Sequence, residues 1–168
     1  IHFFVKIAQD NSCTLAVVGP ENPLAEGMAD AFWKAGIPAV GPKYAAAQLE
    51  ASKDLAKDFM QKYGVACAES KTFTDEAQAL TYIEEKGAPI VVKADGLAAG
   101  KGVIVAQTVQ QAKDAVKELM EGGMVGDAGK KLVIEQYLRG AEISILAAVS
   151  VTPEYAKEGK ACIVPFLS

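Results

Sequence analysis

The chain has 168 residues, of which 51% are hydrophobic and 23% are charged. This composition supplies one substantial hydrophobic core or two small ones, and it excludes an acidic disordered tail, a collagen-like repeat and a disulfide-knotted miniprotein. The net charge is −4, and 16 of the 17 basic side chains are lysines, with Arg139 as the single arginine. Proteins that read nucleic acids usually carry a basic surplus and guanidinium groups, so nucleic acid is not expected as a partner.

The sequence also argues against a membrane partner, a metal cluster and an oxidising compartment. Its longest uncharged apolar runs, such as residues 143–149, are far shorter than the roughly 18 residues that span a bilayer, and we expect no secretory leader. Three scattered cysteines and a single histidine, His2, cannot assemble a zinc site. We therefore expect a soluble, cytoplasmic protein with no metal ligands in this segment.

The two ends of the chain differ from those of most natural domains, which are polar and flexible. The chain begins with Ile1 rather than Met, and it stops at Ser168 within a strand-like apolar run. We therefore expect it to be truncated at both ends.

In the first third of the sequence, short strands alternate with helices. Residues 14–18 form a β-rich run before a Gly-Pro turn, apolar residues at helical spacing follow over 24–35, and residues 38–41 form a second short strand. This order predicts a parallel α/β unit. An Ala-rich helical stretch covers 43–63, and Ser52 suits a cap midway, so the stretch can be one helix or two.

After Gly64 the pattern changes to an α+β unit. Thr74 is the expected cap of the first helix, Gly87 its stop, and Thr108 with Gln111 has the spacing of a capping box. The expected strands are 71–73, 90–93, 103–106, 132–136, 142–151 and 161–165, the last two of which suit a hairpin, and the expected helices start at 74 and 108.

The most informative stretch is the loop at 94–102, between two expected strands. Gly96, Gly100 and Gly102 let backbone N–H groups approach a phosphate chain, and Lys101 leaves an ammonium beside it. The loop is not a P-loop, because the glycine spacing is one residue short and a strand follows instead of a helix. We expect a β-hairpin whose tip closes over phosphates, with Lys93 projecting from its first strand. The alternative is an ordinary Gly-rich hairpin with solvated lysines.

A second group of residues surrounds the strand at 132–136. Its carboxylate, Glu135, is followed by an extended segment whose backbone can meet the edge of an adenine, and Glu142 is placed to reach ribose hydroxyls. Each glutamate taken alone is more often an ordinary surface carboxylate. Together with the Lys93 and Lys101 loop, they predict a nucleotide site.

These two groups of residues resemble the ATP-grasp superfamily, and nearly the whole chain resembles one of its families, the glycinamide ribonucleotide synthetases of purine biosynthesis. Gln136 stands where this family more often has Glu. The matching stretches are 17–21, 23–24, 36–38, 41–42, 46–50, 52–53, 56–57, 59–60, 93–103 and 126–129.

The resemblance implies an α/β fold: part of an N-terminal parallel α/β (pre-ATP-grasp) domain, followed by an α+β ATP-grasp domain. It divides the chain into the end of the N-terminal substrate domain (1–50), a linking helix (51–64), the ATP-grasp lid subdomain (65–131) and the start of the central ATP-grasp sheet (132–168). It also implies a reaction, the ATP-dependent ligation of glycine to 5-phosphoribosylamine through a glycyl phosphate. The products are glycinamide ribonucleotide, ADP and phosphate.

The same resemblance implies roles for individual residues. Lys93 and Lys101 contact ATP phosphates, with Lys101 catalytic, and Gly96, Gly100 and Gly102 form the loop. Glu135, Gln136 and Leu138 hold adenine, the last two through the backbone, and Glu142 binds ribose. Gly19, Pro20 and Glu21 contact the phosphoribosylamine, because ligands bind at the carboxyl ends of strands in open α/β sheets. The cofactors are ATP and Mg²⁺ or Mn²⁺, with metal ligands outside this segment.

Two other interpretations remain. Another ATP-grasp ligase or carboxylase would share the lysines and Glu142, but not the stretches 19–24 and 46–53. A nucleotide-binding fragment without turnover is the second. We expect the isolated 168-residue segment not to ligate, because most of the amino-acid substrate site and the metal ligands of the family lie beyond Ser168.

Overall fold

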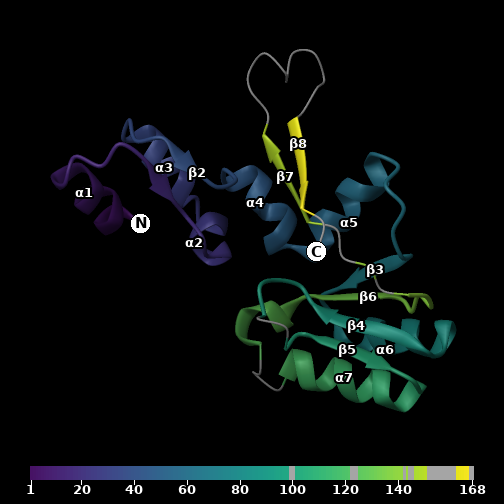
Figure 1. The fold of residues 1–168 in the computed structure, drawn as a ribbon. Helices are drawn as coiled ribbons and strands as arrows, with labels where there is room; N and C mark the ends of the chain where they lie inside the picture. Colours follow the sequence, from purple (N-terminus) through teal and green to yellow (C-terminus); the bar gives the residue numbers. More distant parts are fainter. Residues whose placement is uncertain (99–100, 122–124, 142, 144–145, 151–161, 167–168) are drawn as a thin grey trace. The chain divides into compact units, whose positions relative to one another are not determined.

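A computed structural model describes residues 1–98, 101–121, 125–141, 143, 146–150 and 162–166 of the chain. The chain forms two compact units, residues 1–137 and residues 138–168. The larger unit contains helices and strands, and the described residues of the smaller unit contain two strands. The element order along the chain can be followed in Figure 1.

The first part of the larger unit is a small parallel α/β arrangement. Its elements are α1 (His2–Asp10), β1 (Ala16–Val17), α2 (Glu21–Ala25), α3 (Met28–Lys34) and β2 (Ala39–Val40). β1 and β2 pair in parallel, which confirms the strand–helix–strand prediction. The single helix expected over 24–35 is wrong, because Gly27 has a left-handed backbone (φ 89°) and separates α2 from α3.

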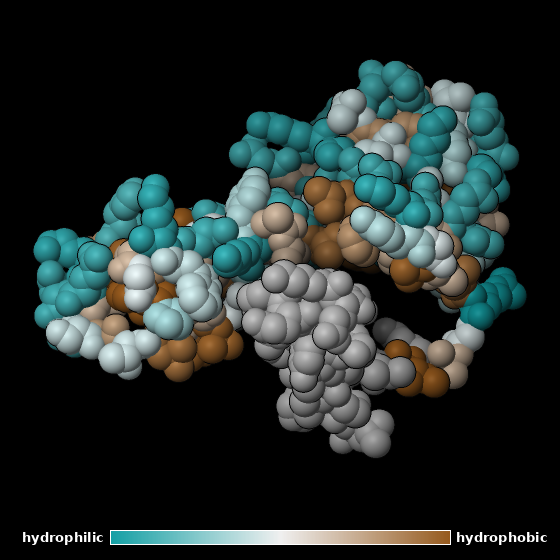
Figure 2. Space-filling model, turned by 90° about the horizontal axis from the view of Figure 1, so that it is seen from above, coloured by the Kyte–Doolittle hydropathy of each residue, from teal (hydrophilic) through white to brown (hydrophobic). Residues whose placement is uncertain are grey.

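Helix α1 was not among the expected elements. Its Phe3, Phe4 and Ile7 are exposed, while Val5 and Ala8 pack on the core. Figure 2 shows hydrophilic surface interrupted by apolar patches on these N-terminal elements. The buried cluster beneath consists of Ala8, Val18, Leu24, Ala29, Phe32, Ile37 and Ala47.

Two helices follow, α4 (Tyr44–Ala51) and α5 (Lys53–Lys62). Ser52 separates them, and its Oγ accepts a hydrogen bond from the Leu55 N–H over 3.2 Å. The stretch 43–63 was expected to form either one helix or two, and the structure shows two helices, with Ser52 as the cap of the second.

The rest of the larger unit is a four-stranded antiparallel sheet. Its strands are β3 (Ser70–Phe73), β4 (Ile90–Ala94), β5 (Val103–Ala106) and β6 (Leu132–Gln136), in the order β3-β6-β4-β5. All three pairings are antiparallel. β6 therefore lies between β3 and β4, in the same sheet as the strands that precede it.

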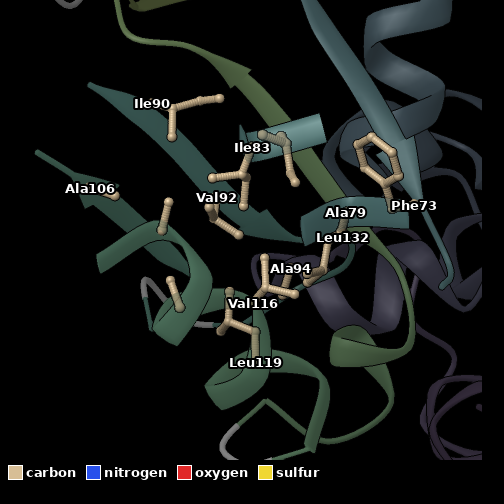
Figure 3. Close-up of a cluster of buried hydrophobic side chains, with 13 residues drawn as sticks. Phe73, Ala79, Ile83, Ile90, Val92, Ala94, Ala106, Val116, Leu119 and Leu132 are labelled. Atoms are coloured by element: carbon tan, nitrogen blue, oxygen red, sulfur yellow. The ribbon is translucent and has the colours of Figure 1, made fainter. Parts of the chain in front are cut away.

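One face of this sheet packs on the helices α6 (Glu76–Lys86) and α7 (Val109–Glu121), with the 3₁₀ helix η1 (Gly126–Lys130) after them. Figure 3 shows alternate side chains of β4, from Ile90, Val92 and Ala94, among those of Ile83, Val116 and Leu119 from the helices. Because side chains alternate across a strand, Lys93 of β4 and Glu135 of β6 project from the opposite face. This alternation places both residues on the side of the sheet away from α6 and α7.

The helix ends follow local signals, with one correction. Helix α6 is capped by Asp75, whose Oδ1 accepts from the Gln78 N–H over 2.9 Å, so the expected cap at Thr74 is wrong by one residue. Gly87 ends this helix with φ 76°, as predicted. The Thr108 hydroxyl accepts from the Gln111 N–H, and the Gln111 side chain accepts from the Gln107 N–H, one residue before the position that a capping box uses.

The smaller unit contains β7 (Leu146–Ser150) and β8 (Cys162–Phe166), which pair antiparallel with Leu146 opposite Phe166. The hairpin-like pairing of these two segments is confirmed, and they form a two-stranded sheet of their own. Over the residues that the structure describes, every helix is too short or too polar to cross a membrane.

Candidate functional site

The glycine-rich loop joins β4 to β5, which pair antiparallel with Lys93 opposite Val103. This confirms the strand–loop–strand hairpin. The base of the loop is closed by hydrogen bonds from the Ala94 N–H to the Gly102 carbonyl (2.7 Å) and from the Asp95 N–H to the Lys131 carbonyl (2.8 Å). Lys101 is exposed, and its N–H donates to the Ala98 carbonyl within the loop.

Close packing explains two of the loop glycines. A Cβ on Gly102 would lie 2.8 Å from the Ala98 Cβ and 3.1 Å from the Ala94 Cβ. Gly96 has φ 132°, a conformation that L side chains rarely adopt, and a Cβ there would approach Ala128 to 3.0 Å. The third glycine of the predicted set, Gly100, lies outside the described residues.

A buried carboxylate lies behind the hairpin. Glu135 is buried, and its two oxygens face two ammonium groups: Lys93 from β4 contacts Oε1, and Lys57 from α5 lies 2.6 Å from Oε2. Burial by itself would raise the pKa of Glu135, but the hydrogen bonds and charges of Lys57 and Lys93 outweigh it and hold the pKa below its ordinary value. Glu135 is therefore ionised at neutral pH and fixed between two cations.

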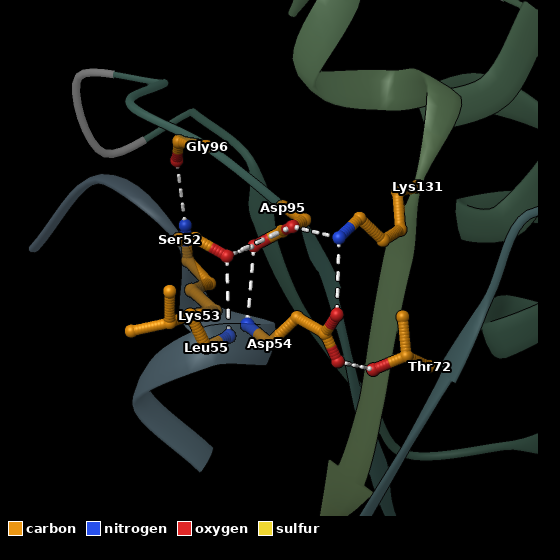
Figure 4. A network of polar contacts seen from close by, with 8 residues as sticks. All are labelled: Ser52, Lys53, Asp54, Leu55, Thr72, Asp95, Gly96 and Lys131. Atoms are coloured by element: carbon orange, nitrogen blue, oxygen red, sulfur yellow. Dashed lines mark hydrogen bonds and ion pairs between the residues drawn. The ribbon is translucent and has the colours of Figure 1, made fainter. Parts of the chain in front are cut away.

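A second polar network ties the base of the loop to the start of α5 (Figure 4). The Asp95 carboxylate, 6% exposed, accepts from the Ser52 hydroxyl (3.2 Å) and the Asp54 N–H (3.2 Å). Lys131, at the end of η1, lies 3.0 Å from both Asp95 and Asp54. Segments far apart in the sequence thus meet at one carboxylate.

The same network sets the charges of its members. The Thr72 hydroxyl donates to the Asp54 carboxylate over 2.5 Å and lowers the pKa of Asp54. Hydrogen bonds to Asp95 and Asp54 raise the pKa of Lys131. Asp54 and Lys131 are therefore both charged at neutral pH.

Lys53, the first residue of α5, donates from Nζ to the Gly96 carbonyl over 2.8 Å. It lines a cavity of about 440 Å³ together with Glu21 and Glu50 and with loop residues that include Gly96 and Gly102. Burial lowers the pKa of the Lys53 ammonium, and the nearby Asp95 opposes this effect without cancelling it. The cavity is therefore lined by one ammonium group, two carboxylates and loop backbone.

The structure brings some of the predicted site residues together. Lys93 and Glu135 are in contact, and Gly96 and Gly102 line one cavity with Glu21. Gly19 lines a neighbouring cavity of about 200 Å³ with Glu21 and Glu50, and Pro20 is the N-cap of α2.

For the other predicted site residues that the structure describes, it gives no hydrogen bond or ion pair with this group. The Gln136 N–H donates to the Glu69 carbonyl, so this group is already used within the fold. Leu138 begins the smaller unit and is 62% exposed. Glu142 lies outside the described residues.

Sequence reasoning gave no role to four residues of the site: Lys53, Lys57, Asp95 and Lys131. The spacing of Lys53 and Lys57, four residues apart in a helical stretch, places them on one side of a helix and is the one sequence signal that could have grouped them. Among the described residues, no three His, Cys, Asp or Glu side chains form a group that could hold a metal ion.

The antiparallel sheet with its glycine hairpin, buried glutamate and preceding α/β element is the arrangement of the ATP-grasp proteins. Solved structures with this fold align over most of the chain at low identity. A biotin carboxylase domain of Hydrogenobacter thermophilus 2-oxoglutarate carboxylase, crystallised with MgADP and bicarbonate, has a TM-score of 0.70 at 18% identity, covering 82% of this chain and 31% of that one. A likeness at this identity establishes the fold alone.

Family models resolve the class further. The model of the phosphoribosylglycinamide synthetase N domain matches residues 1–50, and that of the phosphoribosylglycinamide synthetase ATP-grasp (A) domain matches residues 51–155. The chain belongs to the phosphoribosylglycinamide synthetase family.

Individual relatives agree with this assignment. The phosphoribosylamine–glycine ligase of Haemophilus influenzae is 54% identical over 145 residues, and that of Listeria innocua is 51% identical over 146. The crystal structure of the Thermotoga maritima phosphoribosylamine–glycine ligase is 33% identical with a TM-score of 0.57, over 68% of this chain and 28% of that one. The alignments with the two curated relatives cover 86% and 87% of this chain, and the chain spans about a third of each relative, 34% and 35%.

Proposed function

We propose that this chain supplies the ATP-binding part of a phosphoribosylamine–glycine ligase. In this reaction a glycine carboxylate oxygen bonds to the γ-phosphorus of ATP, and the bond to the β–γ bridging oxygen breaks so that ADP leaves. The amine of 5-phosphoribosylamine then bonds to the acyl carbon of glycyl phosphate and loses a proton, and phosphate leaves with its electron pair. Glycinamide ribonucleotide is the product of this purine-biosynthetic step.

The observation that carries the proposal is the contact between Lys93 and the buried Glu135, at the root of a hairpin whose loop bears Lys101. Transfer of a phosphoryl group requires fixed positive charge around it, and lysines on a rigid strand and an adjacent loop supply that charge. Two family models that match 1–50 and 51–155 support the specific reaction.

The residue roles are part of the proposal. Lys93 and Lys101 bind ATP phosphates, with Lys101 the catalytic residue, within the loop of Gly96, Gly100 and Gly102. Glu135, Gln136 and Leu138 hold adenine, and Glu142 holds ribose. Gly19, Pro20 and Glu21 contact 5-phosphoribosylamine, and the cavity that Glu21 shares with Lys53 supports this role.

We also propose a substrate domain at 1–50, a linking helix at 51–64, a lid at 65–131 and the start of the central sheet at 132–168. The first strand of the last part, β6, pairs with the lid strands β3 and β4. The divalent metal, Mg²⁺ or Mn²⁺, would take its ligands from outside this segment; the described residues contain no group of His, Cys, Asp or Glu suited to it. A cytoplasmic location completes the proposal, supported by the free thiols Cys13 and Cys67.

The experiment is a calorimetric titration of ATP against the full-length protein and its variants Lys101→Ala and Glu142→Ala. Each variant is expected to weaken ATP binding by roughly tenfold or more, because each removes a charged or hydrogen-bonded contact to the nucleotide. Lys62→Met is the matched control, since Lys62 lies in the last turn of α5, whereas the contacts of this helix with the loop are made at its start by Ser52 and Lys53. Unchanged affinity in both variants would refute the nucleotide site.

A further inference from the structure

The cluster around Glu135 has an imbalance of charge. One carboxylate faces two ammonium groups, and all three side chains are largely shielded from solvent, with exposed fractions of 7% for Glu135, 14% for Lys57 and 25% for Lys93. One lysine is enough to neutralise one carboxylate. The cluster therefore holds one positive charge in excess. Keeping an uncompensated charge in a poorly solvated place costs free energy, and an approaching anion lowers that cost.

The two lysines are not equivalent. The Lys57 ammonium has two partners, because Nζ also donates to the Ala68 carbonyl over 3.2 Å. Its helix, α5, is in addition tied to the loop through Asp95. Lys93 is more exposed, stands at the root of the glycine loop, and within the described residues has Glu135 as its one ion-pair partner. Lys93 is thus the lysine that can turn toward an incoming anion.

From this asymmetry we infer that Lys57 is a positioning residue: it keeps Glu135 neutralised and oriented while Lys93 turns from Glu135 to a nucleotide phosphate. The inference rests on the proposed function, since the anion is a phosphate of ATP. Lys57 itself touches no nucleotide in this account and acts through Glu135 and Lys93.

The physical reason is the penalty for leaving a buried carboxylate without a cation. If Lys57 were absent, the departure of Lys93 would strand the Glu135 charge in a site of low polarity, so Lys93 would be held where it is. ATP binding would then have to overcome the full attraction between Lys93 and Glu135. With Lys57 present, the Glu135 carboxylate keeps its ion pair with Lys57 when Lys93 leaves.

The test is a double-mutant cycle on the full-length protein, read as the dissociation constant for ATP. Lys57→Gln removes the charge and keeps a polar, unbranched side chain, and it is expected to weaken ATP binding roughly tenfold. In the background Glu135→Gln, which has no carboxylate to strand, the same Lys57→Gln change is expected to alter affinity less than twofold. Lys57→Arg, which keeps the charge, is expected to retain most of the affinity, and Lys62→Met is the control on the same helix.

Equal weakening in both backgrounds, or no effect of Lys57→Gln, would overturn the inference, because a purely structural role gives additive changes. If the wild-type protein binds no ATP, the proposed function fails and the inference fails with it. If a Lys57 variant does not fold, a crystal structure of the wild-type ATP complex decides the matter. Lys93 within hydrogen-bond distance of a phosphate oxygen and Lys57 still on Glu135 would support it, and Lys57 on the phosphate would overturn it.

Discussion

The Asp95 carboxylate accepts the backbone N–H of Asp54 over 3.2 Å, so a residue at the base of the glycine loop caps the first turn of a helix that lies earlier in the chain. The first N–H groups of a helix have no partner within it, and a carboxylate there also interacts favourably with the helix dipole. Ser52 and Lys131 complete the coordination of this nearly buried side chain. Asp95 therefore fixes the loop to α5, in addition to the hydrogen bond from Lys53 to the Gly96 carbonyl.

Replacing this carboxylate should cost stability. Asp95→Ala is expected to lower the free energy of unfolding by about 3 kcal/mol, because it removes charged hydrogen bonds from a buried position and leaves the Asp54 N–H without its acceptor. Urea denaturation followed by circular dichroism measures this change. Asp58→Ala, at an exposed site on the same helix, should stay within about 0.5 kcal/mol of wild type. A loss at Asp95 no greater than at Asp58 would contradict the role of the network.

Glu135 predicts a specific dependence of stability on pH. Its folded pKa lies below the ordinary value of 4.5, so its contribution is fully present above pH 4.5 and is lost as the pH falls through the lower folded value. Glu135→Gln is therefore expected to be about 3 kcal/mol less stable than wild type at neutral pH, with the difference narrowing as the pH drops below 4.5.

Other carboxylates with lowered pKa, such as Asp54, are common to both proteins and cancel in this difference. Glu118→Gln, on the exposed side of α7, provides the control and should follow the wild-type curve. A wild-type to Glu135→Gln difference that stays constant down to about pH 3 would show that the pairing with Lys57 and Lys93 does not hold the pKa low.

Gly129 in η1 leaves no room for a side chain. A Cβ there would collide with the Leu119 carbonyl oxygen, and the Val125 Cγ2 lies 3.2 Å away. Gly129→Ala is expected to lower the free energy of unfolding by about 2 kcal/mol, because α7 and η1 must separate to admit the methyl group. Thermal melting checks this, with Gly140→Ala as the control, since nothing lies within 4 Å of a Cβ at that site. Equal melting temperatures for the two variants would refute the close contact.

Local signals made much of the fold predictable. The hairpin of β4 and β5 follows from two apolar runs around a glycine loop, and Ser52 and Gly87 mark helix ends by their own chemistry. Where a prediction depended on a few neighbouring residues, errors were small, as in the cap at Asp75 instead of Thr74. The break at Gly27 was missed because the apolar spacing continues across it.

The candidate site was only partly predictable, because its contacts join segments that are distant in the sequence. Motif spacing pointed to Lys93 and Glu135, but not to the burial of Glu135 or to its second partner, Lys57. The role of Asp95 could not be predicted for the same reason, since nothing near it in the sequence indicates that its carboxylate oxygens contact the start of α5. Such pairings depend on how the sheet and helix pack, which no local pattern encodes.

The most direct test of the central claim is ADP formation by the full-length protein, measured with each substrate left out in turn. We predict that sustained ADP release requires both glycine and 5-phosphoribosylamine. Lys101→Met is expected to lower kcat by roughly tenfold or more, because an ammonium in the loop stabilises the transferring phosphoryl group, whereas Lys62→Met is not. ADP formation that proceeds with bicarbonate or another carboxylate in place of glycine, or that is indifferent to 5-phosphoribosylamine, would contradict the account.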